Sequence, residues 1–429
     1  MPLCLRALPN RIADAARSRP QSFRRLPFAR TTSREALMKT IPQIESLQAD
    51  MTQWRRDLHA HPETAFEEDR TAAIVAEKLK SFGIETHVGM AKTGVVGTIR
   101  NGNGKRTVGL RADMDALPME ELNDFDHRSK HTGKMHACGH DGHTAMLLGA
   151  AAYLAKHRNF NGTVHLIFQP AEEMAGGGKV MIDEGLFKKF PCDAVFGLHN
   201  LPGIEVGKFA VRGGPLLASS DRFDITVKGV GAHGAFPHQS IDPVPIAAQI
   251  VLALQTIVTR TLDPLQSAVI SVTKIEGGNA YNVIPEEVKL AGTVRAFSPE
   301  VQGTIERRMR EIVEGICATH GAKGSLHWDV GYPPTINADA EAAIAAKVAA
   351  DLVGQSNVIP DAPPSMAADD VAFMLMERPG AHVLIGNGVG EGVGEGGCHV
   401  HNPHYDFNDR ILALGASFWA RLAETYLKP

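Results

Sequence analysis

The sequence predicts an α/β protein in which a mixed sheet flanked by helices is interrupted by a second, smaller two-layer α/β unit. Apolar, β-rich runs alternate with segments whose apolar residues recur every three or four positions, which predicts the larger part. The order strand, helix, strand, strand, helix, strand over residues 222–332 predicts the smaller part. A chain of 429 residues is also longer than one average domain.

The overall composition excludes several classes of function. Hydrophobic residues make up 44% of the chain and charged residues 21%, which is ordinary for a globular protein. The net charge of −4 gives no basic footprint for nucleic acid and no signal for an anionic membrane. We find no apolar run of the ~20 residues that cross a bilayer. The 5 cysteines are odd in number and widely scattered, so we expect a reducing, cytoplasmic compartment.

Residues 1–37 differ from the remainder of the chain. They hold 8 arginines against 2 acidic residues, a composition that is typical of an organelle transit peptide. Met38 offers an alternative start, which would make residues 1–37 a disordered or mis-assigned leader. We favour the second interpretation and leave these residues out of the fold.

Residues 38–221 and 333–429 are expected to form one domain around the mixed sheet. Its expected helices lie at 41–59, 68–82, from Thr144 onward, at 338–353, after the segment 365–370 and at the C-terminus. Its expected strands lie at 94–99, 107–110, 163–168, 194–198 and 381–385. The glycine-rich residues 386–397 are interpreted as a mobile loop, because no Lys-Ser/Thr pair follows them as in a phosphate-binding loop.

Residues 222–332 are expected to form the inserted unit. Its expected strands lie at 224–229, 268–275, 287–297 and 323–330, and its expected helices at 243–259 and 301–320. The chain then returns to the first domain through Pro333 and Pro334, which suit a linker.

The segment 136–143 holds the densest group of metal-binding side chains. It reads His-Ala-Cys-Gly-His-Asp-Gly-His, and its two glycines let several side chains turn toward one point. Thiolate and imidazole suit zinc and its neighbours among the divalent metals. Two alternatives are a polar loop with a structural cysteine, and a catalytic Cys138 with a histidine as its base.

Further polar side chains follow three of the expected strands. Asp113 comes after the strand at 107–110, Glu172 and Glu173 after 163–168, and His199 after 194–198. Ligands bind at the carboxyl edge of an open α/β sheet, so we expect these segments to converge there. The candidate metal ligands are Cys138, His140, Glu172, Glu173, His199 and one of His399, His401 and His404.

The adjacent carboxylates of Glu172 and Glu173 indicate a division of roles. One can bind a metal ion while the other faces a water molecule beside the ion. That arrangement favours metal-assisted hydrolysis, in which a carboxylate takes the proton of the water.

Six motifs together resemble one enzyme family. They lie at 111–118 (RADMDALP), 136–143, 169–173 (QPAEE), 197–200 (GLHN), 231–238 (GAHGAFPH) and 401–409 (HNPHYDFND). From about residue 40 to the C-terminus, the chain resembles the hippurate hydrolase and auxin-conjugate hydrolase branch of the aminoacylase/carboxypeptidase metallohydrolases. The wider superfamily has a ligand histidine where this chain has Arg111, an arginine that this branch shares.

The resemblance implies a zinc-peptidase-like catalytic domain with an inserted, ferredoxin-like lid or dimerisation domain. It implies an amidohydrolase that holds two divalent ions per subunit (Zn, Mn, Co or Ni) and cleaves hippurate-like N-acyl or N-aroyl amino acids. The chain would act as a homodimer or a higher homo-oligomer, formed through the inserted domain. The alternatives are a metallo-dipeptidase or carboxypeptidase and, from another class, a non-catalytic metal-dependent binding protein.

The resemblance also implies a role for individual residues. The implied metal ligands are Cys138, His140, Glu173, His199 and His401. Glu172 would be the general base, and Asp113 would orient a ligand. His233 would reach the active site of the partner subunit and stabilise the oxyanion of the tetrahedral intermediate. Asn282 and Arg295 would hold the carboxylate of the substrate.

Overall fold

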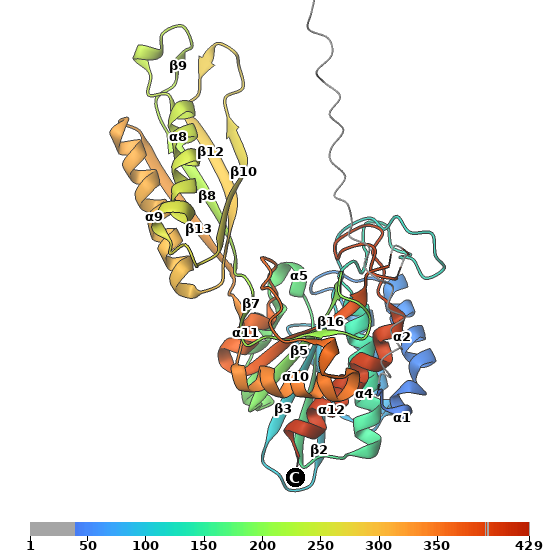
Figure 1. Cartoon of the computed structure of the whole chain (residues 1–429). Coiled ribbons are helices and arrows are strands. Elements are labelled where there is room, and N and C mark those ends of the chain that lie inside the picture. The colour runs from blue at the N-terminus through green and yellow to red at the C-terminus, as the bar shows by residue number, and fades with distance from the viewer. Residues whose placement is uncertain (1–38, 391, 393, 429) are drawn as a thin grey trace, which may run out of the picture. The chain divides into compact units, whose positions relative to one another are not determined.

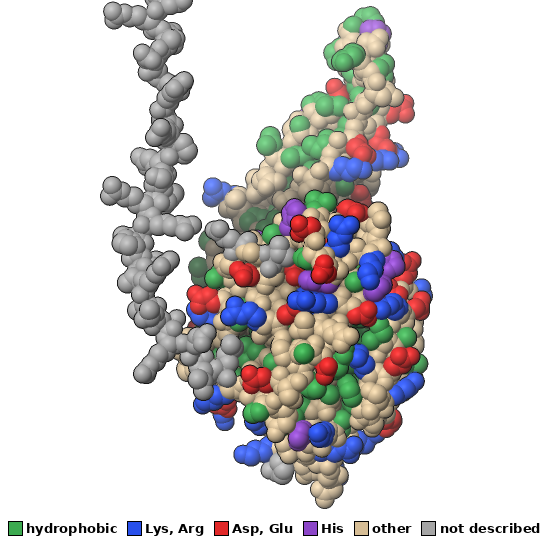
Figure 2. All heavy atoms as spheres, turned by 90° about the vertical axis from the view of Figure 1, so that its right-hand side faces the viewer, with side chains coloured by type: hydrophobic (Ala, Val, Ile, Leu, Met, Phe, Trp, Pro, Cys, Tyr) green, Lys and Arg blue, Asp and Glu red, His purple; other side chains and the backbone are tan. Residues whose placement is uncertain are grey.

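The computed structural model describes residues 39–390, 392 and 394–428 (Figure 1). The predictions for the leader, residues 1–37, and for a start at Met38 lie outside the described residues. On the face shown in Figure 2, basic and acidic side chains are interspersed over the surface. The net charge of −4 is therefore not concentrated in one patch of this face.

Within the described residues, eight strands form one mixed sheet in the order β1-β2-β4-β3-β5-β16-β6-β15. The strands are β1 (Glu85–Met90), β2 (Gly94–Asn101), β3 (Thr107–Asp113), β4 (Gly162–Gln169), β5 (Ala194–Pro202), β6 (Phe209–Ala210), β15 (Val358–Ile359) and β16 (Gly380–Gly388). The central strands β4, β3, β5 and β16 run parallel, so their carboxyl ends lie at one edge. The predicted fold class, α/β with a mixed sheet, is confirmed.

Helices cover this sheet. They are α1 (Pro42–Glu45), α2 (Gln48–Ala60), α3 (Asp69–Ser81), α4 (His140–His157), α5 (Glu172–Ala175), α6 (Gly177–Asp183), α7 (Leu186–Lys189), α10 (Asp339–Val353), α11 (Val371–Glu377) and α12 (Leu412–Tyr426). Helix α4 is buried along nearly its whole length, between α2 and α12. Close approach requires glycine there, because a Cβ at Gly149 would lie 2.2 Å from the sulfur of Met51.

Several elements differ from the sequence prediction. The helix expected at 41–59 breaks into α1 and α2 at Leu47, whose N–H donates to the carbonyl of Ile44 three positions earlier and whose backbone leaves the helical conformation. Helix α4 begins at His140 rather than at Thr144, because Gly139 before it takes a left-handed conformation with φ of 99°. Strand β1 was not predicted, since most of its side chains are exposed and give no apolar signal.

A second sheet of four antiparallel strands lies at 220–332. Its order is β10-β12-β8-β13, from β8 (Ser220–Lys228), β10 (Ala268–Gly277), β12 (Glu287–Ala296) and β13 (Lys323–Tyr332). Helices α8 (Pro243–Thr256) and α9 (Pro299–Thr319) pack on it and form a core of their own around Phe223, Ile250 and Ile305. This is the predicted order of elements. The domain boundaries and the role of this unit as a lid or dimerisation domain stay predictions.

Short elements complete the fold. Strands β9 (Ala232–His233) and β11 (Val283–Ile284) form a two-stranded sheet, as do β7 (Gly214–Leu217) and β14 (Thr335–Asn337). Single helical turns are η1 (Pro237–Gln239), η3 (Gln355–Asn357) and η4 (Asp409–Ile411), and a π-helix, η2 (Ile257–Thr261), continues α8. These short elements lack the long periodic pattern on which the sequence prediction depends.

By length and composition alone, the stretch Pro243–Thr261 is apolar enough to cross a membrane, which the sequence did not predict. Its Ile246, Ile250 and Leu254 side chains are buried in the second core, as in a core helix of a globular protein. On its outward side, the Leu252 side chain is 72% exposed. Helix α8 therefore carries apolar residues on both faces.

The sequence explains where helix α9 begins and which face it buries. The side chain of Ser298 accepts a hydrogen bond from the N–H of Val301, and Pro299 occupies the first turn. Apolar residues recur every fourth position from Val301 to Cys317 and are all buried against the second sheet.

Replacing Ile305 by alanine should lower the free energy of unfolding by roughly 2–5 kcal/mol, because a fully buried side chain leaves a cavity. Chemical denaturation followed by circular dichroism measures the change. Gly315→Ala in the same helix is the matched control, since nothing lies within 4 Å of its Cβ position. It should raise the free energy of unfolding by up to about 1 kcal/mol. Equal losses for both variants would contradict the packing of Ile305.

Candidate metal centre

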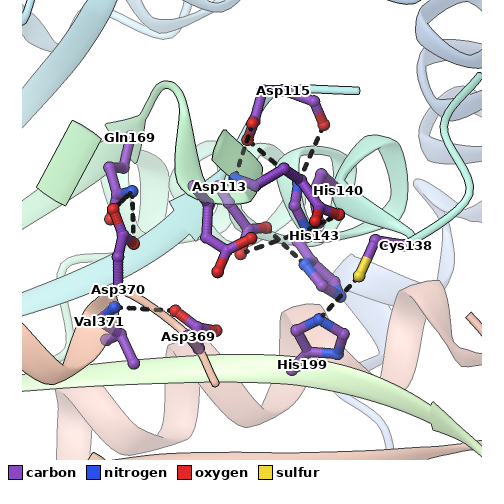
Figure 3. A network of polar contacts seen from close by, with 12 residues as sticks. Asp113, Asp115, Cys138, His140, His143, Gln169, His199, Asp369, Asp370 and Val371 are labelled. Atoms are coloured by element: carbon purple, nitrogen blue, oxygen red, sulfur yellow. Dashed lines mark hydrogen bonds and ion pairs between the residues drawn. The ribbon is translucent and has the colours of Figure 1, made fainter. Parts of the chain in front are cut away.

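Cys138 and His140 lie on either side of Gly139, where the chain enters α4 (Figure 3). Both side chains are buried, Cys138 at 8% exposure and His140 at 0%. Glycine is required between them, because a Cβ at position 139 would lie 2.2 Å from Asn200 Oδ1 and the φ of 99° is left-handed. The tight turn therefore places a thiol and an imidazole at one point.

The imidazoles of His140 and His199 both turn Nδ1 toward a backbone carbonyl and leave Nε2 for the site. The Nδ1 atom of His140 lies 2.9 Å from the carbonyl oxygen of Asp115, and that of His199 lies 2.6 Å from the carbonyl of Asn200. A carbonyl only accepts, so the proton of each neutral ring sits on Nδ1 and the lone pair on Nε2. The Nε2 atom of His199 lies 3.4 Å from Cys138 Sγ.

Glu173 and His401 reach the same place from two other segments. Glu173 lies on the short helix α5 after strand β4, and its Oε1 atom is 3.2 Å from His401 Nε2 and 3.9 Å from His140 Nε2. The N–H of His401 donates to the carbonyl of Ala137 at 2.7 Å, which fastens its segment beside Cys138. His401 itself takes a left-handed conformation with φ of 64°.

The five side chains form two overlapping groups of donors. One group is Cys138, His140 and His199, and the other is Cys138, Glu173 and His401. Within each group the donor atoms lie within 4.8 Å of one another. Cys138 belongs to both groups, and its thiolate together with imidazole and carboxylate forms a donor set that would suit zinc and similar divalent ions.

The buried charges fit a divalent cation at this place. Among the described residues, His140 Nε2 and Glu173 Oε1 are buried atoms without a hydrogen-bond partner. Burial raises the pKa of the Cys138 thiol well above its usual value, and the charges of Glu173 and Glu172 add to the shift. Against the effect of burial, Asp113 and Asp115 raise the pKa of His140 to about 10. The surrounding carboxylates thus favour positive charge, which a bound cation would supply.

Glu172 lies beside these groups and is 6% exposed. Burial, followed by the charges of Asp369 and Glu173, raises its pKa well above the usual value. Glu172, Asp369 and Asp370 also form a compact acidic group. A carboxylate in such surroundings holds a proton more readily than one in water, which suits a group that receives a proton during a reaction.

The guanidinium group of Arg111 is the positive charge that pairs with Asp369 and Asp370 of this acidic group and with Asp113. Its guanidinium group is 1% exposed and lies 2.8 Å from Asp113, 3.1 Å from Asp369 and 2.9 Å from Asp370. Its Nε atom donates to Gln169 Oε1 at 2.8 Å. Figure 3 shows that these acidic side chains come from strand β3 and from the segment before α11. Arg111 therefore joins two parts of the chain through charge.

The structure brings together the five predicted ligands and Glu172. The Asp113 carboxylate lies 2.6 Å from the Nδ1 atom of His143. The Nδ1 atom of His140 instead faces the backbone carbonyl and the carboxylate of Asp115. The role predicted for Asp113, orienting a ligand, stays a prediction.

Three predicted residues lie elsewhere. His233 is on β9, Asn282 precedes β11, and Arg295 is on β12, where it donates to Ser220 Oγ at 2.6 Å. Among the described residues, no hydrogen bond or ion pair joins His233 to the donor groups. The roles of His233, Asn282 and Arg295 stay predictions.

Sequence reasoning missed the residues that surround the donors. Asp115, Asp369 and Asp370 were not given a role, although an acidic pair directly before an apolar helix was a visible signal at 369–370. The local sequence predicts no role for His143 either, whose Nε2 atom accepts from the N–H of Asn200 at 3.0 Å. These residues are positioned by contacts between distant segments, and such contacts leave no pattern in the local sequence.

Comparison with known proteins gives relatives along almost the whole chain. A hippurate hydrolase from Campylobacter jejuni is 42% identical over 391 residues, which covers 91% of this chain and 100% of the relative. An IAA-amino acid hydrolase from Arabidopsis thaliana is 41% identical and covers 88% of this chain and 85% of the relative. The sequence profile of Peptidase family M20/M25/M40 matches residues 109–425.

The chain belongs to Peptidase family M20/M25/M40. The predicted resemblance to the aminoacylase/carboxypeptidase metallohydrolases is thereby confirmed, and with it the prediction of a hydrolase. A solved structure from Bacillus subtilis, titled a dinuclear metal binding peptidase from the M20 family, has a TM-score of 0.78 at 34% identity. The match covers 90% of this chain and 99% of that chain.

Replacing Arg111 by methionine should lower the free energy of unfolding by about 3–5 kcal/mol, because three buried carboxylates lose their cation. Thermal and chemical denaturation measure the loss. Arg56→Met is the matched control: its ion pair with Asp409 lies at the surface, with the arginine side chain 50% exposed. The control should cost about 0–1 kcal/mol. If the two variants lost the same stability, the buried network would not carry the stabilising charge.

Proposed function

We propose that this member of Peptidase family M20/M25/M40 is a metal-dependent amidohydrolase that cleaves the amide bond of N-acyl amino acids. The products are a carboxylate and a free amino acid, and hippurate-like N-aroyl amino acids are the preferred class. One observation carries the proposal: Cys138, His140, Glu173, His199 and His401 converge from distant segments, with the buried carboxylate of Glu172 beside them. The similarity to a hippurate hydrolase and to an IAA-amino acid hydrolase supports the substrate class.

Two divalent ions, Zn, Mn, Co or Ni, are the proposed cofactors. Cys138, His140 and His199 would hold one ion, and Cys138, Glu173 and His401 the other. When bound, the ions would polarise the substrate carbonyl and make a water molecule more acidic. Thiolate, imidazole and carboxylate together accept all of these metals, so availability decides which of them is bound.

Glu172 is the proposed general base and acid. Its carboxylate takes one proton from the water whose oxygen attacks the amide carbon. It then returns that proton to the amide nitrogen as the carbon–nitrogen bond breaks and the amino acid leaves. The side chain is 6% exposed, so bulk water has little access to the proton.

A cavity of about 340 Å³ opens beside Glu173 and is the proposed substrate site. Its lining combines apolar side chains, among them Met174 and Phe373, with the cationic side chains of Lys179 and Arg222. Ser220, to which Arg295 donates, also lines the cavity, which supports the role proposed for Arg295 in binding the substrate carboxylate. Asn282 would assist, and His233 would act on the active site of a partner subunit.

We also propose a homodimer formed through the second sheet. Strand β10 is at the edge of this sheet and carries Ile275, which is 64% exposed. On helix α8, Leu252 is 72% exposed and Val244 is 48% exposed. An unpaired strand edge beside an apolar helix face favours pairing with a second copy of the same surface.

The decisive variant for the reaction is Glu172→Gln, which keeps the size of the side chain and removes its ability to take a proton. With Mn, Zn or Co bound, kcat on an N-acyl amino acid should fall by about 10²–10⁴-fold. The metal content from elemental analysis should stay unchanged. Glu67→Gln is the matched control, because the Glu67 side chain is 66% exposed and pairs with Lys134 rather than with a donor residue. Full activity of Glu172→Gln with metal bound would refute the role of Glu172.

A substrate panel separates the proposal from its alternatives. Hippurate-like amides should be hydrolysed faster than dipeptides with a free α-amino group, and chelation should stop the reaction. The reverse preference would favour a metallo-dipeptidase or carboxypeptidase, in line with the peptidases that the family includes. Metal binding without any hydrolysis would favour a binding protein.

Leu252→Lys should shift the chain from dimer to monomer in sedimentation velocity, because it places a charge in the proposed apolar contact. Val88→Lys on β1 is the matched control, since Val88 is 53% exposed but lies on the other sheet. A wild-type chain that sediments as a monomer at all concentrations would refute the dimer.

A further inference from the structure

The helical turn that carries Glu172 and Glu173 is too short to hold its own shape. Helix α5 spans only Glu172–Ala175, and a single turn orders several dihedral angles for very few hydrogen bonds. Ala171 and Gly176 bracket it, both in the left-handed conformation with φ of 57° and 62°. The position of these carboxylates therefore depends on contacts from outside the turn.

Tyr332 makes two of these contacts with one oxygen atom. Its hydroxyl donates to the carbonyl oxygen of Glu172 at 2.5 Å and accepts from the N–H of Gly176 at 3.1 Å. In a regular α-helix, the N–H of Gly176 would donate directly to the carbonyl of Glu172, four positions earlier. The hydroxyl of Tyr332 stands between these two groups and replaces the direct bond.

The other contacts restrain different atoms of the turn. Glu68 accepts from the N–H of Ala171 at 2.9 Å, and Asp115 accepts from the N–H of Glu173 at 3.0 Å. Glu68 and Asp115 bind only N–H groups of the turn, so neither of them contacts the carbonyl oxygen of Glu172. The N–H of Gly177 donates to the carbonyl of Ala171 at 3.0 Å and joins the segments that flank the turn. Inside the turn, the hydroxyl of Tyr332 is the contact that holds the carbonyl of Glu172 apart from the N–H of Gly176.

The ring of Tyr332 is itself held in place. Phe373 on α11 packs against it edge to face, with ring centroids 6.0 Å apart and an angle of 77° between the planes. Tyr332 also ends β13, where it pairs with Ser220 on β8. The hydroxyl is therefore positioned by rigid elements and not by the turn that it supports.

We propose that Tyr332 is a positioning residue for Glu172, whose hydroxyl holds the turn open and so fixes the place of the carboxylate. This role rests on the proposed function of Glu172 as the base. Without the hydroxyl, the Glu172 carbonyl and the Gly176 N–H either lose their partner or close onto each other. Both outcomes move the backbone of Glu172, and a shift of about 1 Å in a reacting group can cost on the order of 100-fold in rate.

Tyr332→Phe tests the proposal, because it removes one oxygen atom and keeps the ring that packs on Phe373. In the metal-loaded enzyme, kcat for an N-acyl amino acid should fall by about 10- to 100-fold while KM changes by less than about threefold. The metal content and the melting temperature should stay close to those of the wild type. A loss of metal together with kcat would overturn the proposal, since the tyrosine would then support the ions rather than the base.

Tyr153→Phe is the matched control. Its hydroxyl also makes a hydrogen bond, to Glu424 at 3.1 Å, but lies on α4 far along the helix from the donors. Removing it should leave kcat within about twofold of the wild type. Comparable losses of kcat in both variants would overturn a specific role for Tyr332.

Hydrogen–deuterium exchange gives a readout that does not depend on activity. In Tyr332→Phe, the backbone amides of residues 172–176 should exchange faster, whereas those of β4 should not change. If the wild type hydrolyses its substrate and Tyr332→Phe keeps full kcat, the positioning role is refuted and the proposed function stands. If the wild type hydrolyses no N-acyl amino acid, the proposed function is refuted. Unchanged exchange at 172–176 would then refute the role of Tyr332 as well.

Discussion

Carboxylates that are removed from water repel one another, and the centre of this protein depends on cations that offset this repulsion. Arg111 offsets it on one side, where Asp113, Asp369 and Asp370 surround a guanidinium group that water does not reach. On the other side, the donor groups around Cys138 provide the place for divalent ions. The raised pKa of Glu172 belongs to the same balance, because its carboxylate lies between the two sides.

Much of the fold and of the candidate site could be predicted because both follow from local patterns. Apolar runs followed by Asp113, Glu173 and His199 indicate the carboxyl edge of a sheet, and the parallel strands β3, β4 and β5 do bring these segments together. The Cys-Gly-His turn was readable because glycine and metal-binding side chains alternate over a few residues. The second unit was readable from its order of strands and helices alone.

What could not be predicted depends on contacts between distant segments. Asp369 and Asp370 acquire a role only because Arg111 lies opposite them, more than 250 positions earlier in the chain. Helix α5 has only four residues and no periodicity, so nothing local distinguishes it from a loop. Tyr332 lies two positions beyond the strand expected at 323–330, and its hydroxyl meets the Glu172 carbonyl only in the folded chain. Short strands such as β6 and β15 exist because neighbouring strands offer them a partner.

The cavity beside Glu173 takes its wall from two separately packed cores. Glu173 and Lys179 follow strand β4, whereas Arg222 and Asp329 pair across neighbouring strands of the second sheet. Among the described residues, the grouped donors all come from the first of these two parts. Substitutions at Arg222 or Asp329 therefore change the wall of the cavity on the second sheet, whereas Tyr332 at the end of β13 links that sheet to the turn that carries Glu172 and Glu173.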